Sequence, residues 1–133
     1  MIGNRIVLDT SVVIDLFKGD KEVASFLSKQ QEIYMPFAVL GELYLGAHRS
    51  ACEKKHLQDV KDFLLECNIL SADAVTAEKY AILKAALLKK GTPIPENDIW
   101  IAATAIQHDL PLYTTDKHFD LIDGLTLVNK YAT

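Results

Sequence analysis

Short apolar runs alternate with longer segments along almost the whole chain. The short runs are rich in the β-branched residues that favour buried strands. They lie at residues 5–9 (RIVLD), 32–36 (EIYMP), 68–71 (NILS), 110–116 (LPLYTTD) and 125–129 (LTLVN). The longer segments have the length and spacing of helices, and they lie at residues 11–20, 21–30, 37–47, 53–66, 74–91 and 96–108.

Regular alternation of strands and helices predicts an α/β fold with a mainly parallel central sheet and helices on both of its faces. No internal repeat, low-complexity tract or linker interrupts the pattern, and 133 residues are enough for one buried core. We therefore expect a single domain over residues 1–133. Gly19 and Gly91 are expected to end the helices that precede them.

Composition adds three expectations about the class of protein. Half of the residues are hydrophobic, which excludes a disordered chain. No apolar run reaches the roughly 20 residues of a membrane span, and Met1 is not followed by a signal-peptide pattern. The two cysteines, Cys52 and Cys67, lack CxxC spacing and suggest no disulfide framework. A reduced, cytoplasmic location is the expectation.

Two aspartates directly follow predicted strands. Asp9 comes after IVL and Asp116 comes after LYTT. In parallel sheets ligand sites lie outside the carboxyl ends of the strands, so a pair of such acids is a stronger signal than either alone. Asp9 has a simpler alternative role, because Asp, like Thr10 and Ser11 beside it, is a favoured helix cap.

Glu42 is the one charged residue of an otherwise apolar helical segment, FAVLGELYLGA. An ordinary surface helix has a polar face several residues wide, so Glu42 either lies on a narrow solvent stripe or points into a cavity. Gly41 and Gly46 each weaken a helix, which predicts that they permit close backbone packing.

Asp98 begins a second apolar helical segment, which carries no further charge until Asp109. Acids in a first turn are favoured by the helix dipole. We expect Glu96 and Asn97 to cap this helix and Asp98 to face a cleft.

Four carboxylates close together would repel one another unless a cation were present. Oxygen ligands without His or Cys favour Mg²⁺ or Mn²⁺ over zinc. Asp9, Asp98 and Asp116 are the expected direct ligands, and Glu42 would act through a water or orient the attacking one. His48 and Cys52 have i, i+4 spacing, but two ligands do not make a zinc site.

The net charge of −4 argues at first against a nucleic-acid partner. If the four acids belong to a metal site, the remaining 14 acidic residues balance the 14 basic ones, and local distribution matters more than the sum. The densest basic stretch, HRSACEKKH at residues 48–56, either faces phosphate or is a solvated connection between helices.

Four segments at this spacing resemble the PIN-domain nucleases, and more narrowly the VapC-like toxins of type II toxin–antitoxin pairs. They are LDTSVVIDLF, GELYLGA, NDIWIAATA and LYTTDKHFDLIDGL, and together they span nearly the whole chain. The resemblance implies a Mg²⁺-dependent endoribonuclease, with Mn²⁺ also possible, that leaves 5′-phosphate and 3′-hydroxyl ends on its RNA substrate. It also implies a homodimer and a small VapB-like antitoxin whose C-terminal segment lies across the cleft.

The site residues carried over from the resemblance divide into two groups. The acidic site would consist of Asp9, Glu42, Asp98 and Asp116. The supporting polar residues would be Thr10, Ser11, Asn97 and Thr115.

Three alternatives remain open from the sequence. One is a PIN-type nuclease that processes RNA outside a toxin–antitoxin pair. Another is a receiver-like domain that accepts phosphate on an Asp after a central strand, for which Asp73 after NILS is the candidate. The third is a binding module of this fold whose acids are structural.

Overall fold

The computed structural model describes residues 4–129 of the chain. Residues 1–3 and 130–133 of the predicted domain lie outside this described part. The elements, in chain order, are β1 (Arg5–Leu8), α1 (Thr10–Phe17), α2 (Lys21–Ser28), β2 (Glu32–Pro36), α3 (Phe37–His48), α4 (Glu53–Leu64), β3 (Asn68–Leu70), α5 (Ala74–Lys90), α6 (Glu96–Gln107), β4 (Leu112–Thr114), the 3-10 helix η2 (Lys117–Leu121) and β5 (Leu127–Asn129).

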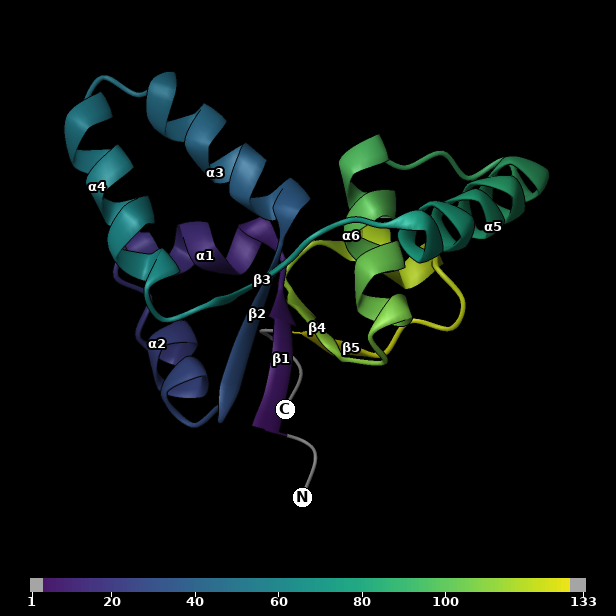
Figure 1. Cartoon of the computed structure of the whole chain (residues 1–133), viewed down its shortest axis with the longest axis horizontal. Coiled ribbons are helices and arrows are strands. Elements are labelled where there is room, and N and C mark those ends of the chain that lie inside the picture. The colour runs from purple at the N-terminus through teal and green to yellow at the C-terminus, as the bar shows by residue number, and fades with distance from the viewer. Residues whose placement is uncertain (1–3, 130–133) are drawn as a thin grey trace.

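The strands form one parallel sheet with β1 at its centre. Within the described residues the strand order is β3-β2-β1-β4-β5, and every neighbouring pair is parallel. Helices α1 to α4 lie on one side of the sheet and α5 and α6 on the other (Figure 1). The predicted fold class is confirmed, and η2 is an element that the sequence pattern did not predict.

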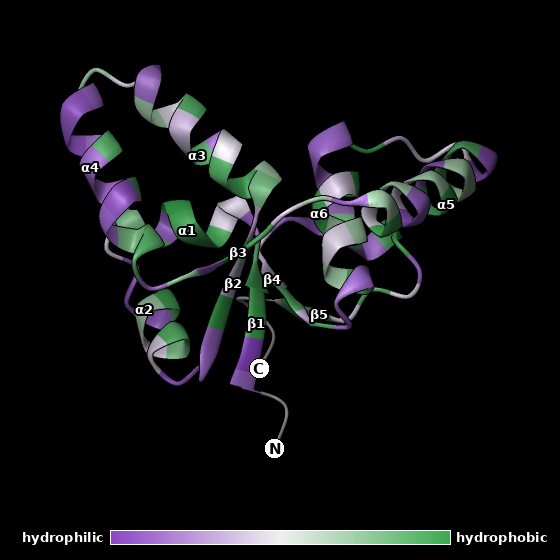
Figure 2. Cartoon of the chain, in the orientation of Figure 1, coloured by the Kyte–Doolittle hydropathy of each residue, from purple (hydrophilic) through white to green (hydrophobic). Residues whose placement is uncertain are grey.

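The central strand is buried on both faces, which explains its unbroken apolar sequence. Ile6, Val7 and Leu8 are at most 1% exposed, and Leu112 on the neighbouring strand is fully buried. Figure 2 shows hydrophobic sequence along β1 and mostly hydrophilic sequence on the outer helix α4. Within the described part of the chain, no helix has both the length and the apolar character needed to cross a membrane.

Two glycines end helices as predicted. Gly19 follows α1 with φ +89°, and Gly91 is the C-cap of α5 with φ +67°. Both values lie in the left-handed region that side chains with a Cβ disfavour.

The expectation for the glycines of α3 is wrong. A Cβ at Gly41 or Gly46 would meet no atom of residues 4–129 within 4 Å, so neither glycine permits close packing within this part of the chain. Gly41 lies on the side of α3 where Phe37 and Leu45 are also exposed, whereas Gly46 lines a pocket formed by α1, α3 and α4. By contrast, α6 is buried over most of its length, as its sequence predicts.

Candidate active site

The site lies where the connections of the sheet change direction. The chain leaves β1 towards β2 on one side, whereas β4 pairs with β1 on the other side. Such a switch point leaves a crevice beyond the carboxyl ends of the two central strands. Asp9 follows β1 directly and Asp116 lies two residues beyond β4, so the topology brings together two acids that are far apart in the sequence.

Asp9 is a buried carboxylate held by two hydroxyl groups. Its Oδ2 atom accepts hydrogen bonds from Ser11 Oγ at 2.8 Å and from Thr114 Oγ1 at 2.7 Å. Asp9 occupies the N-cap position of α1, but its side chain makes no capping hydrogen bond there. Burial raises the pKa of Asp9 above its ordinary value, and the two hydroxyl hydrogen bonds act in the opposite direction.

Glu42 is half-buried on α3 and turns towards the start of α1. Thr10 Oγ1 donates to Glu42 Oε1 at 3.1 Å. Burial raises the pKa of Glu42, and the negative charges of Asp9 and Asp116 add smaller increases. Of the two interpretations of Glu42, the structure therefore supports a carboxylate that faces the other acids.

Asp98 lies in the first turn of α6 and is 8% exposed. Burial, followed by the negative charges of Asp9 and Asp116, raises the pKa of Asp98 to about 6. The hydrogen bond and the charge of His118 partly offset this increase.

The predicted capping of α6 by Glu96 and Asn97 is wrong. The N-cap position is Pro95, and no side-chain capping hydrogen bond forms there. Glu96 instead accepts hydrogen bonds from Tyr80 and Lys84 of α5, because the neighbouring helix offers it a hydroxyl and an ammonium group. Asn97 is exposed and, among the described residues, makes no side-chain hydrogen bond to the acids.

Thr114 is a residue of the candidate site that the sequence did not predict. Its hydroxyl donates to Asp9 and accepts the backbone N–H of Asp116 at 2.9 Å, so it links the two acids. The predicted neighbour Thr115 contributes its backbone N–H instead, which donates to Ser11 Oγ at 3.1 Å. The pair of threonines before Asp116 was the available signal.

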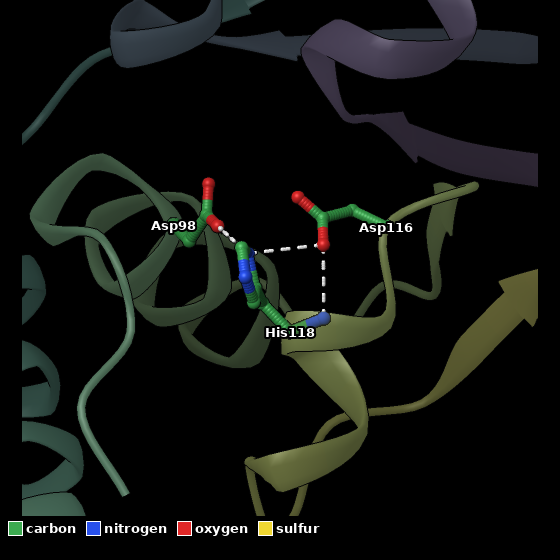
Figure 3. Close-up of side chains that lie close together, drawn as sticks. All are labelled: Asp98, Asp116 and His118. Atoms are coloured by element: carbon green, nitrogen blue, oxygen red, sulfur yellow. Dashed lines mark hydrogen bonds and ion pairs between the residues drawn. The ribbon is translucent and has the colours of Figure 1, made fainter.

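His118 is a second residue of the candidate site that the sequence did not predict. Its Nδ1 atom lies 3.1 Å from Asp98 Oδ2 and 3.0 Å from Asp116 Oδ1, and the ring lies between the two carboxylates (Figure 3). Potential ligand atoms of Asp98, Asp116 and His118 all lie within 4.8 Å of one another. Asp9 and Glu42 lie outside this tight group. The available signal was a histidine two residues after a candidate metal-binding aspartate.

The electrostatics of the site suit a divalent cation. Burial and like charge raise the pKa values of three carboxyl groups, and a nearby positive charge would oppose this increase by favouring the ionised form. The donors that meet here are carboxylate oxygens, which both Mg²⁺ and Mn²⁺ bind, and one imidazole nitrogen, which transition ions accept more readily than Mg²⁺ does. The residues therefore fit such an ion.

Asp73, the candidate of the receiver-like alternative, has a structural role. It follows β3, which is an edge strand, and its carboxylate caps α5 by accepting the N–H groups of Val75 and Thr76. These hydrogen bonds, led by that of Thr76, lower the pKa of Asp73. The acidic cluster lies at the ends of β1 and β4 instead.

The basic stretch at residues 48–56 connects α3 to α4. Within it and just beyond it, His48 pairs with Glu53 at 2.9 Å and Lys55 with Asp59 at 3.1 Å, so part of its charge is balanced locally. Lys55 also lines a pocket of about 310 Å³ that is shared with Glu42. The stretch is therefore mainly a helix connection that places some basic groups beside the site.

The fold and the site define the class of protein. The model of the PIN domain family matches residues 6–125, and the chain therefore belongs to the PIN domain family. Ribonuclease VapC2 of Haemophilus influenzae is 31% identical over 128 residues, which cover 94% of this chain and 97% of that protein. Within the PIN family the chain thus groups with the VapC proteins, as its sequence motifs suggested.

Solved structures agree with this grouping. A chain in the DNA-bound VapBC of Salmonella typhimurium matches with a TM-score of 0.89 at 26% identity, covering 95% of this chain and 98% of that one. VapBC-5 of Mycobacterium tuberculosis, a member of the VapBC family of toxin-antitoxin systems, matches with a TM-score of 0.77 at 26% identity. That match covers 95% of this chain and 97% of that one.

Proposed function

We propose that this protein is a divalent-metal-dependent endoribonuclease and the toxin of a toxin–antitoxin pair. The observation that carries the proposal is that Asp98 and Asp116 lie together in a PIN-domain chain, close enough to Asp9 for its negative charge to act on both. Its relatives with the name ribonuclease VapC support RNA as the substrate.

The proposed roles follow from the position of each side chain. Asp9, Asp98 and Asp116 would hold the cation, with Asp9 fixed in orientation by its two hydroxyl donors. Glu42, positioned by Thr10, would orient the attacking water. A bound Mg²⁺ or Mn²⁺ would supply positive charge at the phosphate and lower the pKa of water.

A protein partner is supported by the surface beside the site. Ile14 and Phe17 of α1 are 41% and 37% exposed, and both line the pocket that contains Glu42. Exposed apolar side chains around a hollow are typical of a protein-binding surface. We propose a small VapB-like antitoxin as the partner, since the similar solved structures are VapBC complexes. A homodimer is part of the same proposal.

The test is RNA cleavage by matched Asp→Asn variants. Asp98→Asn and Asp9→Asn should lower Mg²⁺-dependent cleavage by about 100-fold or more, because each removes a charge that holds the ion. Asp109→Asn is the control, because Asp109 is exposed just beyond the opposite end of α6. Sequencing of RNA 5′ ends after induced expression would identify the substrate. Full cleavage by a folded Asp98→Asn protein would contradict the proposal.

Growth separates a toxin from an RNA-processing nuclease. Induced expression should arrest growth, and the product of an adjacent small reading frame should relieve the arrest. Cleavage without arrest or relief would favour the RNA-processing alternative.

A further inference from the structure

The side chain of His118 introduces a nitrogen donor into a site that the sequence predicts to contain oxygen ligands alone. Its Nδ1 atom is 3.1 Å from Asp98 Oδ2 and 3.0 Å from Asp116 Oδ1. Figure 3 shows the imidazole between the two carboxylates.

The position of His118 is set by the backbone around it. Asp116 is the N-cap of η2, and its Oδ1 accepts the backbone N–H of His118 at 2.9 Å. Phe119, the next residue, is fully buried and anchors η2 in the core. The side chain of His118 is half exposed, so the site remains open to solvent on that side.

The distances from His118 Nδ1 to the two carboxylate oxygens match the distance between neighbouring ligand atoms around a metal ion. Two ligand atoms at right angles about an ion with bonds of about 2.1 Å lie about 3.0 Å apart. Nδ1 has this separation from one oxygen of Asp98 and from one oxygen of Asp116. An ion could therefore bind all three atoms with small movements of the side chains.

We propose that His118 is a metal ligand through Nδ1, and that it makes this site prefer Mn²⁺ over Mg²⁺. The inference rests on the proposed metal-dependent function. Mg²⁺ demands oxygen ligands and gives up its water reluctantly, whereas first-row transition ions accept imidazole nitrogen together with carboxylate oxygen. A ligand set that adds the His118 nitrogen to the carboxylates of the site therefore favours the transition ion more than the carboxylates alone would.

A competing role for His118 predicts the opposite result. If the imidazole acted only as a positive counter-ion of the two carboxylates, it would compete with the metal for the same oxygens. Removal of His118 would then strengthen the binding of both ions. If His118 is a metal ligand, its removal should instead weaken the binding of both ions, and the binding of Mn²⁺ more than that of Mg²⁺.

The experiment measures binding to the metal-free full chain by titration calorimetry with Mn²⁺ and Mg²⁺. His118→Ala should raise the Kd for Mn²⁺ about tenfold or more and change the Kd for Mg²⁺ several-fold less. His118→Leu, a side chain of comparable bulk without a donor atom, provides a second variant with the same expected result if the alanine variant does not fold. His108→Ala is the control, because His108 is exposed at the opposite end of α6 and should change neither value.

A spectroscopic measurement tests the bond itself. Electron spin echo spectroscopy of Mn²⁺-loaded protein should show modulation from a coordinated imidazole ¹⁴N in the wild type and in His108→Ala, and it should be lost in His118→Ala. Tight Mn²⁺ binding that depends on Asp98 but shows no such modulation would overturn the inference and leave the proposed metal site intact. Binding that is unaffected by Asp98→Asn would instead count against the proposed function.

Discussion

Burial and like charge act together on the acids beyond the ends of β1 and β4. Asp9 and Asp98 are almost inaccessible to solvent, and Glu42 is half-buried on α3. Each of their pKa values is raised, with burial as the largest cause. A chain that keeps such a group loses folding stability in the absence of a cation, so the arrangement indicates function rather than structural support.

Replacement of Glu42 by Gln should change the stability of the protein and its RNA cleavage in opposite directions. The metal-free protein should become more stable, because one negative charge near Asp9 and Asp116 is removed. RNA cleavage should fall, because the Thr10-bound carboxylate faces the site. Thermal melts in chelator and a Mg²⁺-dependent cleavage assay measure the two changes. Glu78→Gln, at an exposed position on α5, should leave both unchanged. An unchanged cleavage rate in Glu42→Gln would remove Glu42 from the site.

The raised pKa of Asp98 predicts a pH dependence of stability in the metal-free protein. The folded state binds more protons than the unfolded state between the ordinary value of 3.8 and the folded value of about 6. The free energy of unfolding should therefore fall as pH rises through this window. His118 also lowers the free energy of unfolding as pH rises, but at higher pH. Its pKa is raised by the hydrogen bond to Asp98, and the stability that this interaction provides is lost when the imidazole loses its proton.

Denaturant titrations in chelator at pH 5 and pH 7.5 measure this dependence. The wild type should be more stable at pH 5, and Asp98→Asn should reduce the difference. Asp73 and Glu96, whose pKa values are lowered, affect stability below this range. An equal difference in the free energy of unfolding between the two pH values, in the wild type and in Asp98→Asn, would show that another group causes the pH dependence.

At the level of elements, α3 combines an acidic residue that faces inward with a surface that the fold leaves open. Phe37 and Leu45 are 41% and 57% exposed, and Gly41 and Gly46 have free space around them. The sequence of α3 is thus more apolar than packing within the described chain requires. This excess is consistent with the proposed protein partners.

Gly41→Ala should stabilise the isolated chain by about 0.5–1 kcal/mol, because alanine is the better helix former and its Cβ meets no neighbour. Gly91→Ala is the contrasting variant. Gly91 has φ +67° at the end of α5, where a Cβ introduces strain, so the substitution should lower stability. Denaturant titrations of both variants test the assignment. A destabilised Gly41→Ala would show that a neighbour packs against α3 in solution.

At the level of the whole molecule, metal binding and folding are linked by mass action. An ion that binds the folded state raises the free energy of unfolding, by about 2.7 kcal/mol at 100 times its Kd. Mg²⁺ and Mn²⁺ should therefore each raise the melting temperature. The increase should shrink in Asp9→Asn, which lacks one of the charges at the switch point. An equal increase in both proteins would place the ion elsewhere.

The sequence by itself determined the fold class and the candidate acids of the proposed site. Hydrophobic periodicity and β-branched runs depend on near neighbours in the chain, so the strands, the helices and their glycine ends could be predicted from it. Asp9 and Asp116 could be predicted as site residues because both follow strands, and parallel strands end at one edge of a sheet.

Other features depend on contacts between residues that are distant in the chain. Thr114 and Asp9 are bonded across neighbouring strands, and His118 meets Asp98 only because η2 folds against α6. Glu96 binds α5 instead of capping its own helix, because the fold places Lys84 within reach. The glycines of α3 face open space, because the fold of the described residues brings no other element against them. Local sequence sets what each residue can do, but the tertiary structure decides which partner is within reach.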